Sequence, residues 1–150
     1  SWEDSASAVQ RCAERGIRTT IHLMFGLPGE APAEMLETVE RVAELPIQGV
    51  KLHNLYVAKD TQLAGLYESG HYQPLSQEEY VTIVVGALER LPPSVVIERL
   101  TAETSDDYLI APDWCRRKNE TIELIQKQLV SEDTYQGRRF EDEHPSIVGS

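Results

Sequence analysis

Apolar residues recur along the chain with two alternating spacings, one typical of helices and one typical of strands. Helical spacing predicts a helix over residues 5–15, and a β-prone apolar run predicts a strand over 17–25. A second helix over 31–45 and a second strand over 50–57 follow. A strand, a helix and a further strand make one βαβ unit, so we expect the two strands to be parallel and the crossover to be right-handed.

The same alternation returns after an irregular connection that contains a short helix over 62–68. Ser76, followed three residues later by Glu79, forms a capping box that opens a helix running to about Leu91. The remaining predicted elements are a third strand over 95–100, a loop over 101–113 and a final helix over 118–130.

These elements divide the chain into three parts. Residues 1–104 hold the strand and helix alternation, residues 105–136 are a loop and helix extension, and residues 137–150 are dense in charge and expected to be disordered. Three strands leave the first strand with an unpaired edge, which the rest of a barrel would cover. Since the chain also begins with Ser1 and not with Met, we expect it to be a fragment.

Polar residues occupy one face of both predicted strands. His22 and Met24 share a face of the first strand, and Lys51 and His53 share a face of the second. The opposite face is apolar and carries Ile21, Leu23, Phe25, Val50 and Leu52. A parallel sheet that helices cover on both faces is normally apolar on both, so this pattern favours a barrel-like sheet with a lumen over a doubly wound sheet.

The first strand ends in a short turn. Pro28 can fix φ at the first central position of the turn Leu27-Pro28-Gly29-Glu30, and Gly29 can supply the positive φ of a type II turn. The carboxyl ends of such strands are where α/β proteins bind ligands, although a plain tight turn explains these residues equally well. No Lys-Ser or Lys-Thr pair follows, which excludes a phosphate loop of the Walker type.

Composition narrows the class of protein. With 41% apolar and 26% charged residues the chain is typical of soluble globular proteins, and no apolar run is long enough for a membrane span. The net charge of −11 repels phosphate backbones, so any nucleic-acid contact must be local. The two cysteines, Cys12 and Cys115, form no metal-ligand spacing and no disulfide framework, which indicates a reducing, cytoplasmic compartment.

Among polar side chains, the two strand histidines are the best candidates for a site. His22 and His53 lie near the ends of adjacent predicted strands and could form a site with Lys51, although each histidine alone is more often a core residue. Asp106 and Asp107 are adjacent in sequence, which favours a solvated turn over an acid-base pair.

A resemblance to a known family carries the interpretation further. The run His22-Leu23-Met24-Phe25-Gly26-Leu27-Pro28-Gly29-Glu30 resembles the fifth-strand motif of radical S-adenosylmethionine enzymes, in which a strand ending in Gly-Leu-Pro-Gly-Glu borders the adenine of the cofactor. Further motifs, spread in order over about residues 8–137, resemble the YhcC and YtqA-like branch, which is similar to the catalytic subunit of Elongator. They are Gly49-Val50-Lys51-Leu52-His53, Leu75-Ser76 with Glu79-Tyr80-Val81, Leu88-Glu89 with Leu91-Pro92-Pro93, Arg99-Leu100-Thr101, Leu109-Ile110-Ala111-Pro112 with Trp114, and Asp133-Thr134 with Gln136-Gly137.

The resemblance implies an α/β fold, the C-terminal half of a partial (β/α)6 TIM barrel with a helical extension at its C-terminus. It implies that Met24 packs near the adenine and that the backbone around Gly26 lines the cofactor. The backbone of His53, Asn54 and Leu55 is expected to line it as well, and the expected lumen-facing side chains are His22, Lys51, His53 and Arg99.

The implied chemistry needs more than this chain. In the family, a reduced [4Fe-4S] cluster cleaves S-adenosylmethionine, and the resulting deoxyadenosyl radical abstracts hydrogen from the substrate. The cluster is held by three cysteines spaced Cys-x3-Cys-x2-Cys, which this chain lacks. We therefore expect the isolated chain to be inactive and to need an N-terminal half, and relatives suggest modification of the wobble uridine in tRNA.

Two positions depart from the branch pattern. Lys59-Asp60-Thr61 stands where the branch usually has Lys-Gly-Thr, and Thr101-Ala102-Glu103 stands where it has Thr-Gly-Asp. The side chain of Asp60 could close an approach to the backbone. Two other functions stay open on the sequence: a half barrel without a cluster that binds a nucleotide-like ligand or a protein, and a metal-free TIM-barrel lyase that uses His53 and Lys51.

Overall fold

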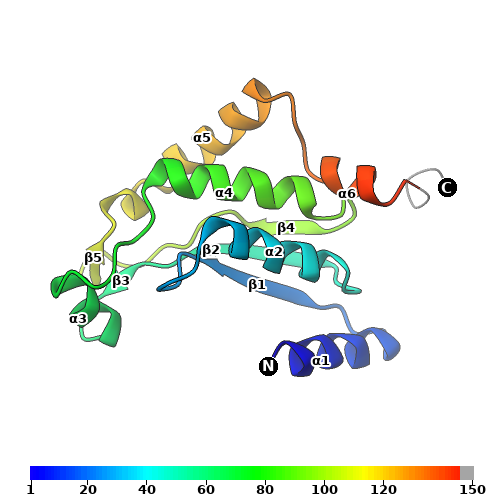
Figure 1. Cartoon of the computed structure of the whole chain (residues 1–150), viewed down its shortest axis with the longest axis horizontal. Helices are drawn as coiled ribbons and strands as arrows, with labels where there is room; N and C mark the ends of the chain where they lie inside the picture. The colour runs from blue at the N-terminus through cyan, green and yellow to red at the C-terminus, as the bar shows by residue number, and fades with distance from the viewer. Residues whose placement is uncertain (146–150) are drawn as a thin grey trace.

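The computed structural model describes residues 1–145, which form a mixed α/β fold (Figure 1). A three-stranded parallel sheet has the order β1-β2-β4, and β3 pairs with β5 in a separate antiparallel sheet. The strands are β1 (Thr20–Phe25), β2 (Gly49–Asn54), β3 (Val57–Ala58), β4 (Val96–Arg99) and β5 (Leu109–Ala111). The helices are α1 (Trp2–Glu14), α2 (Pro32–Ala43), α3 (Gln62–Glu68), α4 (Gln77–Arg90), the 3₁₀ turn η1 (Asp113–Arg116), α5 (Lys118–Ser131) and α6 (Arg138–Glu143).

The predicted parallel pairing of the first two strands is confirmed. His22 of β1 is in register with Lys51 of β2, and Met24 is in register with His53. Lys51 is in turn in register with Arg99 of β4, after an irregularity between Val50 and Lys51. Because residues in register in a parallel sheet share a face, these polar side chains are gathered on one side of the sheet.

The apolar face of the sheet packs against α2 and α4. Phe25 and Leu52 are almost fully buried beneath Val39 of α2 and Tyr80 of α4. The capping box that opens α4 is present, with the Ser76 hydroxyl accepting from the Glu79 amide at 3.2 Å. In residues 1–145, α2 and α4 pack on this face of the sheet, and the opposite face carries the polar side chains of β1 and β2.

The helix α1 lies beyond the edge strand β1, on the side away from α4 (Figure 1). It is fastened by Val9, which is 7% exposed, and by a cation–π contact of 4.2 Å between Arg41 of α2 and the ring of Trp2. No helix in residues 1–145 is both long and apolar enough to span a membrane.

The C-terminal segment differs from expectation. Residues 138–143, expected to be disordered, form α6, whereas residues 146–150 lie outside the described part. The reason is the preceding motif, which ties the chain to the turn between α4 and β4. Thr134 donates to Glu89 at 2.6 Å, Gln136 donates to the carbonyls of Pro92 and Val95, and the Gly137 amide donates to the Leu88 carbonyl. These bonds satisfy buried carbonyls and fix where α6 begins.

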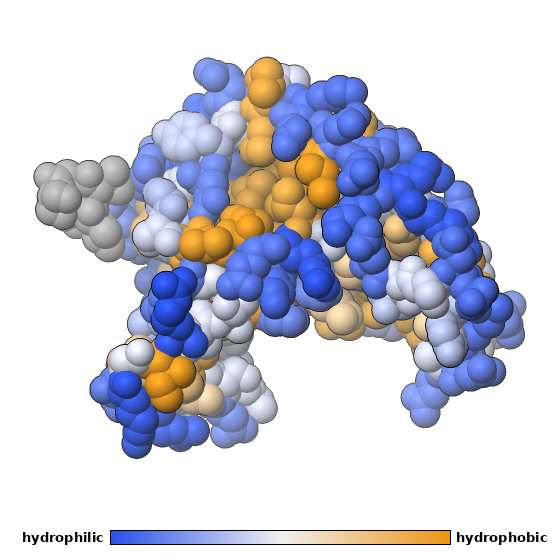
Figure 2. Space-filling model, turned by 180° about the vertical axis from the view of Figure 1, so that it is seen from behind, coloured by the Kyte–Doolittle hydropathy of each residue, from blue (hydrophilic) through white to orange (hydrophobic). Residues whose placement is uncertain are grey.

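The edge of β1 that faces away from β2 has no partner strand in residues 1–145. Apolar side chains are also exposed at Ile17, Met24 and Val96, and Figure 2 shows apolar surface on the face seen from behind. We therefore expect the 150-residue chain to self-associate, because an unpaired strand edge is a template for pairing. Size-exclusion chromatography over a range of concentrations tests this, and a sharp monomeric peak with a cooperative melt would count against it.

Candidate functional site

The candidate site lies on the uncovered face of the β1-β2-β4 sheet. The rings of His22 and His53 are stacked there, with 5.1 Å between ring centroids and 17° between planes. His22 is exposed and His53 is half-buried. The two histidines therefore lie side by side on neighbouring strands, as predicted. His22 is in register with Lys51, two residues before His53, so both rings are on the same face.

His53 is electrostatically unusual. Burial lowers the pKa of its imidazole, and the nearby charges of Arg99, His22 and Lys51 lower the pKa further. Both effects disfavour the protonated form of the ring. Its Nε2 atom is buried and has no hydrogen-bond partner among the described residues. A buried, unpaired ring nitrogen can accept or donate a hydrogen bond to a bound group.

Lys51 is held by a carboxylate on the neighbouring strand. Its Nζ lies 3.5 Å from Oε2 of Glu98, and Oε1 of Glu98 accepts from the Thr20 hydroxyl at 2.7 Å. The hydrogen bond from Thr20 is the main cause that lowers the pKa of Glu98, and Lys51 adds to it. Arg99 is exposed and makes no ion pair within residues 1–145. Lys51 and Arg99, which are in register, thus bring two cations to this face.

The turn after β1 has the conformation that its glycines predict. Gly26 and Gly29 have φ of +94° and +80°, which L-residues rarely adopt. The amide of Glu30 donates to the Leu27 carbonyl at 3.1 Å and closes the turn. The Gly26 carbonyl accepts from the hydroxyl of Tyr72 at 2.7 Å. Tyr72 therefore holds the carboxyl end of β1 in place through this hydrogen bond, a role that the sequence does not reveal.

The exposed end of β1 is apolar. Met24 is 47% exposed and Leu27 is 45% exposed. Both lie where β1 passes into the turn, next to the histidine pair through the register of Met24 with His53. Exposed apolar side chains beside polar groups suit a ligand that has one flat apolar part and one polar part.

Asn54 and Leu55 are two of the residues expected to line the cofactor, and their hydrogen bonds are to other parts of the chain. The Asn54 side chain points to the core face and is 1% exposed. Its Oδ1 accepts from the Thr101 hydroxyl and the Ala102 amide, both at 2.8 Å, and its Nδ2 donates to Cys115 Sγ at 2.9 Å. The Leu55 amide donates to the Phe25 carbonyl at 2.9 Å. Asn54 therefore fastens the loop after β4 to β2, and no periodic pattern of the sequence shows this.

At the first departure from the branch pattern the backbone keeps a glycine-like conformation. Asp60 has φ of +60°, a region that Asp tolerates better than most residues. The next residue, Thr61, accepts from the Ala64 amide at 3.2 Å and caps α3. The Lys59-Asp60-Thr61 segment thus forms a helix-capping turn despite the substituted residue.

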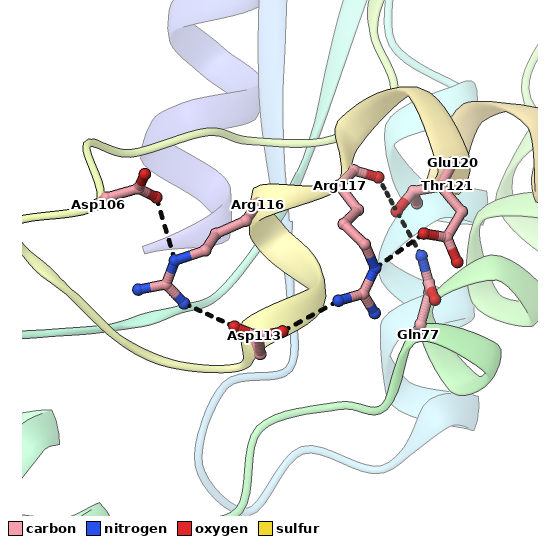
Figure 3. Close-up of polar contacts among 7 residues, drawn as sticks. All are labelled: Gln77, Asp106, Asp113, Arg116, Arg117, Glu120 and Thr121. Carbon is pink, nitrogen blue, oxygen red and sulfur yellow. Dashed lines mark hydrogen bonds and ion pairs between the residues drawn. The ribbon is translucent and has the colours of Figure 1, made fainter.

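Asp106, the first residue of the acidic pair at 106–107, belongs to a network of ion pairs at the surface. Arg116 of η1 links Asp106 at 3.0 Å to Asp113 at 2.9 Å, and Arg117 continues the chain of ion pairs to Glu120 (Figure 3). Gln77 of α4 joins the same corner through the Thr121 hydroxyl. Asp106 is thus tied to Arg116.

The resemblance implies two cofactor groups, an iron–sulfur cluster and S-adenosylmethionine, and the residues of this chain fit them differently. Within residues 1–145 no cluster of three or more His, Cys, Asp or Glu side chains could hold a metal ion. Cys12 lies on α1 and Cys115 is buried in η1, where burial raises the pKa of its thiol to about 11. These residues do not fit an iron–sulfur cluster. The orphaned His53 nitrogen and the exposed end of β1 do fit an adenosyl ligand with a polar substituent.

Comparisons with known proteins agree with the resemblance. Residues 47–131 match the Radical_SAM C-terminal domain. The chain is 37% identical over 133 residues to the uncharacterized protein YtqA of Bacillus subtilis, covering 89% of this chain and 41% of YtqA. It is 28% identical over 130 residues to a tRNA uridine(34) acetyltransferase of Methanocaldococcus jannaschii, covering 85% of this chain and 24% of that protein.

A solved structure shares the fold. The archaeal Elp3 of Methanocaldococcus infernus with an N-terminal deletion (1–46) superposes with a TM-score of 0.74 at 21% identity, over 89% of this chain and 32% of that chain. The chain thus spans well under half of the relatives that it matches. With the domain match over more than half of its length, and with the parallel sheet and its uncovered polar face in place, the chain belongs to the radical SAM family, in the YtqA-like branch related to Elp3.

Proposed function

We propose that this chain is the C-terminal portion of a radical S-adenosylmethionine enzyme that modifies tRNA, and that its sheet is half of a partial (β/α)6 barrel. The observation that carries the proposal is the uncovered polar face of a parallel sheet, with the unpaired edge of β1 beside it. A further set of strands added to that edge would turn this face into a lumen. An N-terminal half of the same protein would supply those strands and the cluster ligands.

In this proposal, residues at the carboxyl end of β1 and β2 bind and orient S-adenosylmethionine. Met24 would pack against the adenine, and the backbone of the Gly26 turn, held in place by Tyr72, would border it. When bound, the cofactor and a reduced cluster held by another part of the enzyme would supply the radical chemistry, while the residues of this chain would bind and orient the cofactor. The His53 ring would offer its free Nε2 to a polar group in the lumen.

The tRNA part of the proposal is supported by the relatives that carry that activity in their names. The charge of this chain limits how it could contact RNA. Its net charge of −11 repels a polyanion, and Arg116 and Arg117 are paired with Asp106, Asp113 and Glu120. The proposal therefore assigns most phosphate contacts to other parts of the enzyme and only the reacting nucleotide to this chain.

The experiment that tests the proposal is to sequence the gene upstream of the Ser1 codon. We expect an in-frame segment with three cysteines in the order Cys-x3-Cys-x2-Cys after a predicted strand. A start codon immediately upstream would remove the cluster chemistry. The half barrel without a cluster, binding a nucleotide-like ligand or a protein, would then be the better explanation.

A further inference from the structure

Positive charge is concentrated on the uncovered sheet face of an otherwise acidic chain. Lys51 and Arg99 lie opposite each other on neighbouring strands, and Arg18, just before β1, is close enough to Glu98 to lower the pKa of its carboxyl group. Glu98 is the carboxylate near Lys51 and Arg18, and it is already bonded to Thr20 and Lys51, whereas Arg99 acts on His53. Three permanent cations thus lie along these strands, although acids outnumber bases by 25 to 14 in the chain as a whole.

Two hydrogen-bonding side chains on this face also lack a partner within residues 1–145. Arg99 has no ion-pair or hydrogen-bond partner within residues 1–145, and His53 Nε2 is buried without a partner. Arg99, His22 and Lys51 all act on His53, so they lie around one point of the face. Excess positive charge and free donors that converge on one point are the features that bind an oxyanion.

We infer that His53, Arg99 and Lys51 form an oxyanion site that binds a phosphate or carboxylate group of a ligand in the lumen. The inference rests on the proposed function only for the ligand that carries this group, since anion binding needs no cluster. The oxyanion would accept hydrogen bonds from the Arg99 guanidinium and from the His53 ring, while Lys51 would add charge from the next register position. Glu98 would oppose binding and keep Lys51 extended along the strand.

The test is a titration of the 150-residue chain, and of the longer protein where its gene encodes one, with inorganic phosphate. Ionic strength is held constant with chloride, and binding is followed by the ring-proton resonances of His22 and His53 in NMR spectra. We expect a saturable shift of both resonances. Arg99→Gln should weaken phosphate binding at least about fivefold, because it removes a charged hydrogen bond to the anion.

A second substitution, expected to strengthen phosphate binding, complements Arg99→Gln. Glu98→Gln keeps an acceptor for the Thr20 hydroxyl but removes the negative charge, so we expect tighter binding of phosphate, by about twofold or more. Arg15→Gln is the matched control, because Arg15 is exposed at the end of α1 and its side chain bonds only to the Arg11 carbonyl among the described residues. It should leave the affinity unchanged.

Competition separates the two sources of an oxyanion. S-adenosylmethionine carries a carboxylate, whereas 5′-methylthioadenosine has the same adenosyl group without it. Displacement of phosphate by the first and not by the second would assign the site to the cofactor. Phosphate binding that neither compound affects would assign it to the substrate. A shift that does not saturate, or equal affinities in the Arg99→Gln, Glu98→Gln and unmodified chains, would overturn the inference, and neither result would bear on whether a cluster half exists.

Discussion

Asn54→Ala is expected to lower the free energy of unfolding by about 3 kcal/mol. The substitution leaves the Thr101 hydroxyl and the Ala102 amide without their shared acceptor, at positions that are 2% and 5% exposed. Each buried donor left unpaired costs about 1–3 kcal/mol. In a chain of this size such a loss lowers Tm by about 10 °C. Urea unfolding followed by circular dichroism measures it.

Asn119→Ala is the matched control for Asn54→Ala. Asn119 is exposed on α5 and makes no side-chain hydrogen bond among the described residues, so its replacement should change the unfolding free energy by less than about 0.5 kcal/mol. If Asn54→Ala cost as little as this control, the loop after β4 would not be held by Asn54. The link from β2 to η1 through Cys115 would then be incidental.

His53→Ala in the complete, reconstituted protein is expected to lower product formation at least about tenfold with the cluster content unchanged. The reason is that His53 presents the free Nε2 on the lumen face, and a lost hydrogen bond to a charged or polar reacting group costs about 1.5 kcal/mol or more. Product is measured by chromatography under anaerobic conditions, and cluster content by iron analysis and absorbance.

His71→Ala serves as the control for His53→Ala. His71 is exposed in the connection after α3, where its ring bonds to Ser69 at 2.9 Å, so its loss should leave turnover unchanged. Unaltered turnover in His53→Ala would remove His53 from the site. A parallel loss of cluster would show that His53 acts on folding and not on the bound ligand.

Much of the parallel sheet follows from local pattern. Alternation in β1 and β2 predicts which face is polar, and the helix length between them predicts the crossover, because both depend on residues close in sequence. The histidine pair follows from the same reasoning, since His22 and His53 sit on one face of adjacent parallel strands. The capping box at Ser76 predicts the start of α4 for the same local reason.

What depends on distant residues could not be predicted in this way. The strand β5 has three residues and pairs with β3, which has two. Strands this short show no periodicity in the sequence, so the sequence predicts only a loop over 101–113. Asn54 was expected at the site through its backbone, but its side chain has partners about 47 and 61 residues away. The order of α6 likewise comes from contacts of Gln136 with the turn before β4.

We expect the complete protein, of which this chain would form the C-terminal part, to be a radical S-adenosylmethionine enzyme. The most direct measurement is the formation of 5′-deoxyadenosine from S-adenosylmethionine, under anaerobic reducing conditions, by the protein that the complete reading frame encodes. We expect this protein, reconstituted with iron and sulfide, to form 5′-deoxyadenosine, and the 150-residue chain alone to form none. A fully reconstituted complete protein that leaves S-adenosylmethionine intact, or product formation by the 150-residue chain alone, would contradict this expectation.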